Sequence, residues 1–213
     1  MNYKPIPAFS FDALTPIYDL LSNIFGFGST QRKQIIDLLD LKNGQRLLDV
    51  GCGTGSLLVI AKKMYPMIDM IGVDIDQKIL EIAKHKSRIQ KLEINFVLSG
   101  SENMRFAKET FDVVVSSLVF HHLPTNIKIV TLTEIYRILK PNGKFLLVDF
   151  GNKNNLLMKI YLYIATILHI PEALTLKDNI EGKLPLFIKE TGFKYKEVSQ
   201  PYRGIQYLLC IKN

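Results

Sequence analysis

The stretch RLLDVGCGTGSLL, from Arg46 to Leu58, joins a short apolar run to a turn with three alternate glycines and then to a second apolar run. The first run is typical of a buried parallel strand, and the second is typical of a helix that follows the turn. Glycine lets a backbone turn tightly and approach a ligand without interference from a Cβ atom. The stretch therefore predicts a strand, a turn and a helix that together bind a nucleotide-like cofactor.

The chain continues this alternation of apolar runs and helical patterns. Strands are predicted at Arg46–Val50, Ile68–Asp74, Glu93–Leu98, Phe111–Ser117 and Gly143–Phe150. Helices are predicted at about 11–25 and 30–41, then at Ser56–Tyr65, Gln77–Gln90 and Asn126–Leu139. Repeated β-α-β alternation predicts a parallel sheet covered by helices on both faces, with right-handed crossovers.

The pattern changes after Phe150. A helical stretch comes first, followed by a helix at Leu184–Thr191 and by strand-like runs at Tyr195–Pro201 and Ile205–Ile211. A short turn ending in Gly204 joins the two runs, which predicts a hairpin. The predicted fold class is therefore α/β, with a doubly wound, Rossmann-like, seven-stranded and mostly parallel sheet that carries an antiparallel edge strand.

Composition excludes several classes of protein. The 213 residues are 47% hydrophobic and 22% charged, which is ordinary for a globular chain. Two cysteines give no disulfide framework and fit a reducing cytoplasm. The N-terminus does not resemble a signal peptide, and no apolar run reaches the roughly 18–20 residues of a spanning helix. The net charge of +7 is spread along the chain, so it favours solubility or an anionic surface over a nucleic-acid groove.

Asp74 ends the second predicted strand, about twenty residues after the glycine turn, where an acid can accept both ribose hydroxyls. Adenosine binding is therefore predicted, and both dinucleotides and S-adenosyl-L-methionine contain adenosine. A dinucleotide turn reads G-x-G-x-x-G, whereas this turn reads G-x-G-x-G. Asp49 precedes the turn, where an acid would repel a pyrophosphate but suits an ammonium group. Both features favour S-adenosyl-L-methionine, with S-adenosyl-L-homocysteine as its product.

Five motifs carry a resemblance to a known family: LLDVGCGTG, GVDID, FDVVVSS, FHHLP and ILKPNGKFLLVDF. Together they resemble a class I S-adenosylmethionine-dependent methyltransferase, similar to the ubiquinone/menaquinone biosynthesis group. The resemblance is close over residues 30–150. It implies one domain, 1–213, with an N-terminal helical lid (1–42), a cofactor-binding core (43–150), a helical acceptor cap (151–192) and a C-terminal hairpin (193–213).

The resemblance also implies which residues bind the cofactor. Those beside its methionine part would be Asp49, Gly51, Cys52, Gly53, Thr54 and Gly55. Asp74 would bind the ribose hydroxyls, Ile75 would contact the adenine, and Ser117 would lie under the sulfonium. Cys52 is interpreted as a packing or ligand-facing residue rather than as a nucleophile.

This chain departs from the family at the adenine. Many relatives carry G-D-A-E before the fourth strand, with the Asp on the adenine amino group. Here the sequence is SGSENMRF, which places Gly100 at that position. Main-chain contacts near Ser101 and Glu102 would replace the missing side chain. In the lid, FDALTPIYDLLSNIFGFG resembles the corresponding helix of the quinone enzymes, which would bring Tyr18 to the cofactor.

His121 and His122 follow the fourth strand at its carboxyl end and are the candidate catalytic residues. One interpretation is that one of them, with His121 preferred, orients or deprotonates the acceptor. The other is that the pair caps the loop. Quinone methyltransferases typically carry an Arg-Asn pair there. No metal is required, and the sequence shows no cluster of metal ligands.

The apolar segment Leu156–Ile170 has three interpretations: a buried helix, the lining of an acceptor pocket, or a membrane contact. With the basic charge, it favours a small hydrophobic or lipid-like acceptor and a cytoplasmic protein that could touch a membrane. Monomer and homodimer both remain open. Quinone-precursor C-methylation is the first alternative. A nicotinamide-dependent oxidoreductase or a non-catalytic binding module is the alternative of another class. Nucleic-acid methylation is disfavoured, because SSLVFHHLP lacks an N-P-P-Y-like tetrad.

Overall fold

The computed structural model describes residues 28–151, 160, 163, 167, 171–199 and 204–213. The chain forms two compact units, Met1–Ser101 and Glu102–Asn213. The predicted helix at about 11–25, and with it the predicted lid residue Tyr18, lie outside the described residues. Among the described residues, no helix has both the length and the apolar character needed to cross a membrane.

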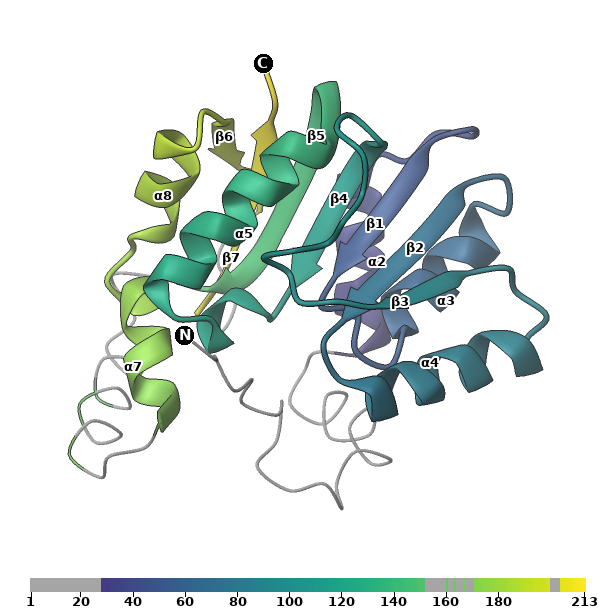
Figure 1. Ribbon diagram of the computed structural model, residues 1–213, viewed down its shortest axis with the longest axis horizontal. Helices are drawn as coiled ribbons and strands as arrows, with labels where there is room; N and C mark the ends of the chain where they lie inside the picture. The colour runs from purple at the N-terminus through teal and green to yellow at the C-terminus, as the bar shows by residue number, and fades with distance from the viewer. Residues whose placement is uncertain (1–27, 152–159, 161–162, 164–166, 168–170, 200–203) are drawn as a thin grey trace. The chain divides into compact units, whose positions relative to one another are not determined.

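The first unit contains three parallel strands in the order β3-β2-β1. They are β1 (Arg46–Val50), β2 (Asp69–Asp74) and β3 (Asn95–Leu98). The helices are α2 (Ser29–Leu39), α3 (Ser56–Met64) and α4 (Gln77–Ile89). Because both βαβ crossovers run in the same direction across the strands, right-handed connections place α3 and α4 on one face. There α3 contacts both α2 and α4, while α4 lies along β2 and β3 (Figure 1).

Local chemistry explains where α4 begins and which face it buries. The side chain of Asp76 accepts hydrogen bonds from the backbone N–H groups of Lys78 and Ile79, at 2.8 and 3.3 Å. Such an N-cap contributes about 1 kcal/mol. Leu80 and Ala83, one turn apart, are buried, so the helix turns its apolar stripe inward.

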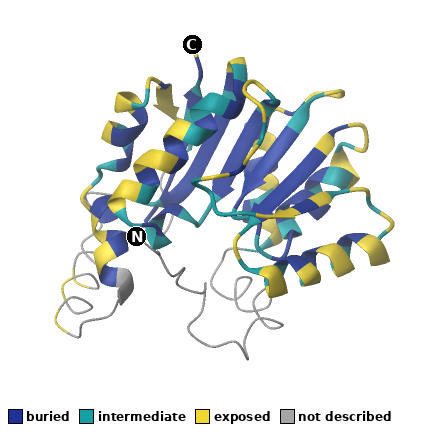
Figure 2. Cartoon of the chain, viewed as in Figure 1, coloured by how far each residue is buried: buried dark blue, intermediate teal, exposed yellow. Residues whose placement is uncertain are grey.

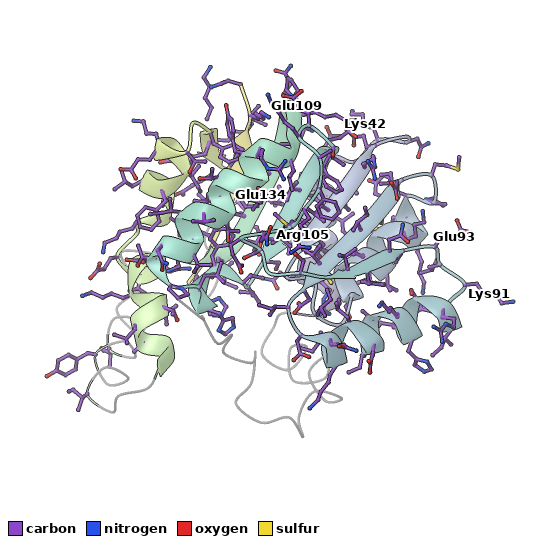
Figure 3. All side chains as sticks on the ribbon, in the orientation of Figure 1. Lys42, Lys91, Glu93, Arg105, Glu109 and Glu134 are labelled. Atoms are coloured by element: carbon purple, nitrogen blue, oxygen red, sulfur yellow. The ribbon has the colours of Figure 1, made fainter. Side chains whose placement is uncertain are left out.

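The edge strand β3 is partly exposed to solvent. Phe96 is buried, whereas Val97 and Leu98 are exposed. Lys91 and Glu93 stand at the turn between α4 and β3, at the outer edge of the unit (Figure 3). Charged residues beside an exposed strand discourage pairing with another chain.

The second unit contains four strands in the order β4-β5-β7-β6. They are β4 (Phe111–Ser117), β5 (Leu139–Phe150), β6 (Lys194–Glu197) and β7 (Ile205–Ile211). Strand β5 is parallel to β4, and β7 is antiparallel to both β5 and β6. The helices are α5 (Thr125–Ile138), α7 (Pro171–Ile180), α8 (Leu184–Glu190) and the 3₁₀ turn η2 (Phe120–His122).

Helices α5 and α8 contact each other beside β5 and β6 (Figure 1). Near the end of α5, Arg137 donates to the carboxylate of Glu134 at 2.6 Å and to the backbone oxygen of Phe106 at 2.7 Å, which ties the helix to the segment before β4 (Glu134 is labelled in Figure 3). The strands of both units are mostly buried, and the exposed residues lie mainly on the helices and turns (Figure 2).

Strand β5 begins earlier than predicted. The sequence predicts its start at Gly143, but the strand begins at Leu139, directly after α5. Leu139 pairs with Phe111, and the register then shifts so that Lys144 pairs with Val113. The Pro-Asn-Gly segment is therefore accommodated as an irregularity within the ladder rather than as a separate turn before it.

Helix α7 lies inside the predicted helical segment 151–192, but its bounds and the turn η2 were not predicted, and a buried ion pair helps to hold α7 in place. Lys128 of α5 is fully buried, and its ammonium donates to the backbone oxygen of Thr175 at 2.6 Å. The same ammonium lies 3.5 Å from the carboxylate of Asp178, which also accepts from Lys183 at 3.1 Å. These contacts fasten α7 to α5, and α7 also contacts η2 and β5.

The predicted fold class is confirmed by these two units. Both contain parallel strands joined by helices, and together they supply seven strands. The predicted C-terminal hairpin is present as β6 and β7 and supplies the antiparallel pairing.

Candidate cofactor and acceptor site

The glycine turn after β1 has the geometry that its sequence predicts. Gly51, Gly53 and Gly55 have φ angles of +74°, +52° and +71°, in the left-handed region that L side chains rarely adopt. The N–H groups of Gly51 and Cys52 both donate to the backbone oxygen of Val73, at 2.8 and 2.9 Å. The turn is therefore pinned to β2.

Two of these glycines meet different surroundings. A Cβ atom at Gly53 would meet nothing within 4 Å, so the backbone here is open to a ligand. A Cβ atom at Gly55 would lie 2.9 Å from the ring of Phe96 and 3.1 Å from Ala83. The absence of a side chain at Gly53 therefore lets a ligand approach the backbone. At Gly55 it lets the start of α3 pack closely against Phe96 and Ala83.

Cys52 and Thr54 direct their side chains into the protein. Cys52 is buried, and a Cβ atom at Gly72 would lie 2.7 Å from its sulfur. Burial, reinforced by the carboxyls of Asp49 and Asp74, holds the pKa of the Cys52 thiol well above its usual range. The Thr54 hydroxyl accepts a hydrogen bond from the Lys86 ammonium at 3.0 Å. A protonated, packed thiol is a poor nucleophile, which agrees with the packing interpretation of Cys52.

Asp74 organises the turn from the end of β2. Its carboxylate accepts from the N–H of Gly53 at 2.9 Å and from the N–H of Asp76 at 3.0 Å. Burial raises the pKa of this carboxyl, and hydrogen bonds from the backbone of Asp76, Gly53 and Ile75 partly oppose the rise. A carboxylate has about four lone-pair directions, so these hydrogen bonds still leave room for a ribose hydroxyl. The next residue, Ile75, is 44% exposed and offers an apolar surface beside the carboxylate.

Asp49 is the most unusual group of the first unit. Only 3% of the residue is exposed, and no described residue donates a hydrogen bond to its carboxyl. Burial, together with the neighbouring Asp74, raises the pKa of its carboxyl to about 8, even though Arg32 of α2 acts in the opposite direction. A carboxyl in this condition is stabilised as an anion only when a cation binds it. Arg32 was not predicted, because only the packing of α2 brings it near Asp49.

The second unit has its own buried carboxylate, Asp149, near the end of β5. It is fully buried, and one of its oxygens accepts from the backbone N–H groups of Val119 and Phe120, at 2.9 and 2.7 Å. The other oxygen accepts from the N–H of Phe150 at 2.8 Å. Asp149 therefore holds the loop that leaves β4 and forms η2.

Asp149 also orients His121. The Nδ1 atom of His121 lies 2.9 Å from the carboxylate, and the Nδ2 amide of Asn179 donates to the same oxygen at 3.1 Å. Burial alone would raise the pKa of Asp149, but His121 and the hydrogen bonds lower it below its ordinary value. An ionised Asp149 only accepts hydrogen bonds, so neutral His121 carries its proton on Nδ1 and leaves Nε2 as the basic atom. Sequence reasoning missed Asp149, although its motif LLVDF ends a predicted strand.

The two predicted histidines differ in their surroundings. Their rings lie 3.9 Å apart between centroids, and the ring of Phe150 stands edge-on to His121 at 4.9 Å. Burial, with the adjacent His121, lowers the pKa of His122 to about 4. His122 is therefore a neutral ring near pH 7 and a weak base.

The remaining predicted site residues divide between the two units. Ser101 is the last residue of the first unit and Glu102 is the first of the second, and both are partly buried. Ser117 is the last residue of β4 and pairs with Val148 of β5. No group of His, Cys, Asp and Glu suited to a metal ion occurs among the described residues.

Comparison with known proteins assigns the family. Residues 41–185 match a family described as a methyltransferase domain, and the chain belongs to that family. This confirms the predicted class I S-adenosylmethionine-dependent methyltransferase domain and its cofactor.

Two curated relatives and a solved structure illustrate the similarity. A demethylmenaquinone methyltransferase of Lactobacillus johnsonii is 32% identical over 70% of this chain and 63% of its own length. One from Thermus thermophilus is 31% identical over 66% of this chain and 64% of its own length. The match thus spans less than two thirds of these relatives. The crystal structure of a SAM-dependent methyltransferase from Aquifex aeolicus shares the fold, with a TM-score of 0.67, 18% identity, and coverage of 84% of this chain and 88% of that one.

The buried carboxyl of Asp49 predicts an increase in stability when its charge is removed. Asp49→Asn keeps the shape of the side chain but cannot ionise. Because the folded-state pKa is raised from about 3.9 to about 8, the stability that the neutral carboxyl gives is complete below pH 4 and is lost as the pH rises through 8. Urea unfolding should show the variant about 2–4 kcal/mol more stable than wild type at pH 8, with a much smaller gain at pH 5.

Asp69→Asn is the matched control, because Asp69 is exposed and pairs with Arg46 at the surface. Its effect should stay within about 0.5 kcal/mol at both pH values. An Asp49→Asn variant that is equally stable or less stable than wild type at pH 8 would show that Asp49 is not buried as described.

Proposed function

We propose that this protein transfers a methyl group from S-adenosyl-L-methionine to a small hydrophobic acceptor. The observation that carries the proposal is the cluster of Asp49, the glycine turn and Asp74 within one unit of a methyltransferase-domain chain. The buried carboxyl of Asp49 needs a cation to be stable as an anion, and the backbone at Gly53 is open to close approach. The carboxylate of Asp74 accepts hydrogen bonds from the protein and can still accept from a ligand. These are the requirements of an amino-acid ammonium group and a ribose.

Each part of the cofactor has a partner in the first unit under this proposal. Asp49 binds the ammonium group, and Arg32 binds the carboxylate of the methionine part. Asp74 accepts from the ribose hydroxyls, and Ile75 packs against the adenine. When bound, the cofactor supplies an activated methyl carbon, and the protein contributes alignment and exclusion of water.

The other predicted contacts remain proposals as well. The buried side chains of Cys52 and Thr54 limit these residues to contacts through their backbone. The remaining proposed contacts are the backbone of Ser101 and Glu102 with the adenine, Ser117 with the sulfonium region, and Tyr18 with the bound cofactor.

His121 is the proposed general base for the acceptor, and Asp149 is its positioning residue. The hydrogen bond to Asp149 fixes the ring and leaves Nε2 free of its proton in the neutral form. His122, with its pKa lowered to about 4, serves as a neutral neighbour that holds the first ring in place. A base of this kind suits an acceptor that must lose a proton as it is methylated.

The second candidate for the methyl acceptor is a reduced quinone precursor, which is a more specific assignment than a small hydrophobic molecule. Two observations favour it: the names of the relatives in Lactobacillus johnsonii and Thermus thermophilus, and a histidine–aspartate pair suited to a ring hydroxyl. Ile160, Tyr163 and Ile167, within the predicted acceptor cap, are exposed apolar residues. They support a hydrophobic acceptor or a peripheral contact with a membrane.

Cofactor binding is tested with Asp74→Asn and S-adenosylhomocysteine. The substitution removes the charge from the hydrogen bonds to ribose, each worth roughly 1.5–3 kcal/mol, so the affinity measured by calorimetry should fall about tenfold or more. Asp76→Asn is the matched control, two residues away, because Asn caps a helix as well as Asp does. Its affinity should stay within about twofold of wild type.

NAD should give no binding heat under the same conditions. Tight binding of NAD, or equal affinity of wild type and Asp74→Asn for S-adenosylhomocysteine, would contradict the proposed cofactor site.

The base is tested with His121→Ala and Asp149→Asn, using a demethylated naphthoquinol with a short prenyl chain as acceptor. Each substitution should lower kcat about 100-fold and remove the acid limb of the pH–rate profile, while the affinity for S-adenosylhomocysteine changes little. The double variant should be no slower than the slower single variant, because the two residues act as one unit.

His85→Ala is the control, since His85 is an exposed residue of α4. If the losses in kcat are additive in the double variant, or if His121→Ala keeps full activity, His121 and Asp149 serve only to cap the loop. Cofactor binding without any turnover of the naphthoquinol would remove the quinone-precursor candidate and leave the broader function standing.

A further inference from the structure

Two buried amide side chains, those of Asn179 and Gln206, lie near Asp149 in the second unit. Asn179 lies on α7 and is fully buried, and Gln206 lies on β7 and is 4% exposed. Gln206 stands directly opposite Asp149 in the antiparallel register of β5 and β7. A Cβ atom at Gly151 would overlap the Gln206 amide and lie 3.2 Å from the backbone oxygen of Asn179. The amide of Gln206 and the end of α7 therefore converge over Gly151.

One atom of each amide has no hydrogen-bond partner in the structure. These atoms are Oδ1 of Asn179 and Nε2 of Gln206, and both are closed to bulk water. The orientation of the Asn179 amide is fixed, because its Nδ2 donates to the carboxylate of Asp149 at 3.1 Å. Reversing the amide would place oxygen against oxygen. Asn179 thus presents an unused acceptor, and Gln206 presents an unused donor.

Leaving these groups unpaired is costly. A buried polar group without a partner costs about 1–3 kcal/mol, and apolar side chains of the same shape would avoid that cost. The buried amide of Asn179 also shares the carboxylate of Asp149 with His121. The unused acceptor and donor are therefore placed within the hydrogen-bonded cluster that contains the proposed base.

We propose that Asn179 Oδ1 and Gln206 Nε2 form a polar subsite that binds a hydroxyl group of the methyl acceptor. A hydroxyl has one donor and two acceptor lone pairs, so it can donate to Asn179 while it accepts from Gln206. The ligand class is a hydrophobic ring or chain that carries a hydroxyl. This inference rests on the proposed function, because it assigns the ligand to the acceptor. It adds a specificity-determining pair to that function.

The experiment uses the full chain and a matched pair of probes, 1-naphthol and 1-methoxynaphthalene. The methoxy compound keeps the ring and the acceptor oxygen but cannot donate to Asn179. Calorimetry with protein saturated in S-adenosylhomocysteine should show 1-naphthol binding about tenfold tighter than 1-methoxynaphthalene, as expected for one buried hydrogen bond. The same titrations without S-adenosylhomocysteine keep this test independent of cofactor binding.

Gln206→Met tests the donor, because methionine has a similar length and no N–H group. Its affinity for 1-naphthol should fall about five- to tenfold, while the preference for naphthol over the methoxy compound persists through Asn179. The melting temperature should stay equal or rise, since a buried unpaired donor has been removed. Leu208→Met is the control on the same face of β7, and it should change neither probe affinity.

The outcomes separate the subsite from the proposed function. Equal affinity of wild type for the two probes, or no binding of 1-naphthol, overturns the subsite. An unchanged affinity for 1-naphthol in Gln206→Met, together with a raised melting temperature, also overturns the subsite. It would show that the unpaired atoms of Asn179 and Gln206 only destabilise the fold. Failure of S-adenosylhomocysteine to bind, with the probe preferences intact, overturns the proposed function instead.

Discussion

The carboxyl of Asp49 is buried almost completely away from water, and no described residue donates a hydrogen bond to it. Burial therefore raises its pKa to about 8, and the carboxyl remains largely neutral near pH 7. A cation at this position would convert the cost of burial into binding energy. The glycine turn and Asp74 lie around the same strand ends, so the proposed cofactor site of the first unit depends on this buried carboxyl.

Asp149 in the second unit is the opposite case. It is equally buried, but backbone N–H groups, His121 and Asn179 supply its hydrogen bonds, and its pKa falls below the ordinary value. Under the proposed function, the carboxyl of Asp49 gains its partner only when a ligand binds. The carboxylate of Asp149 already has hydrogen-bond partners within the protein and holds those groups in place. The unpaired atoms next to it, on Asn179 and Gln206, are then the part of this cluster left for an acceptor.

The sequence predicts most of the fold, because apolar runs with clear ends set the strands. The bounds of Arg46–Val50, Phe111–Ser117 and Ile205–Ile211 are the same in prediction and structure. Strand β5 was predicted too short, since a Pro-Asn-Gly segment has the composition of a turn even where the ladder continues past it. The bounds of α7 within the predicted helical segment 151–192 were not predicted, because part of what positions this helix is the tertiary ion pair with Lys128. Motif spacing likewise predicts residues of a cofactor turn, but it cannot predict partners that only folding brings together, such as Asp149.

The central claim is that the carboxyl of Asp49 is neutral until the ammonium group of the cofactor binds it. Calorimetric titration with S-adenosylhomocysteine at pH 7, in phosphate and in Tris, measures the protons exchanged on binding. A carboxyl with a pKa near 8 that becomes ionised in the complex must release close to one proton at this pH. The account predicts that release for wild type and none for Asp49→Asn, which should also bind weakly. Binding heats that are identical in the two buffers for the wild-type protein would contradict it.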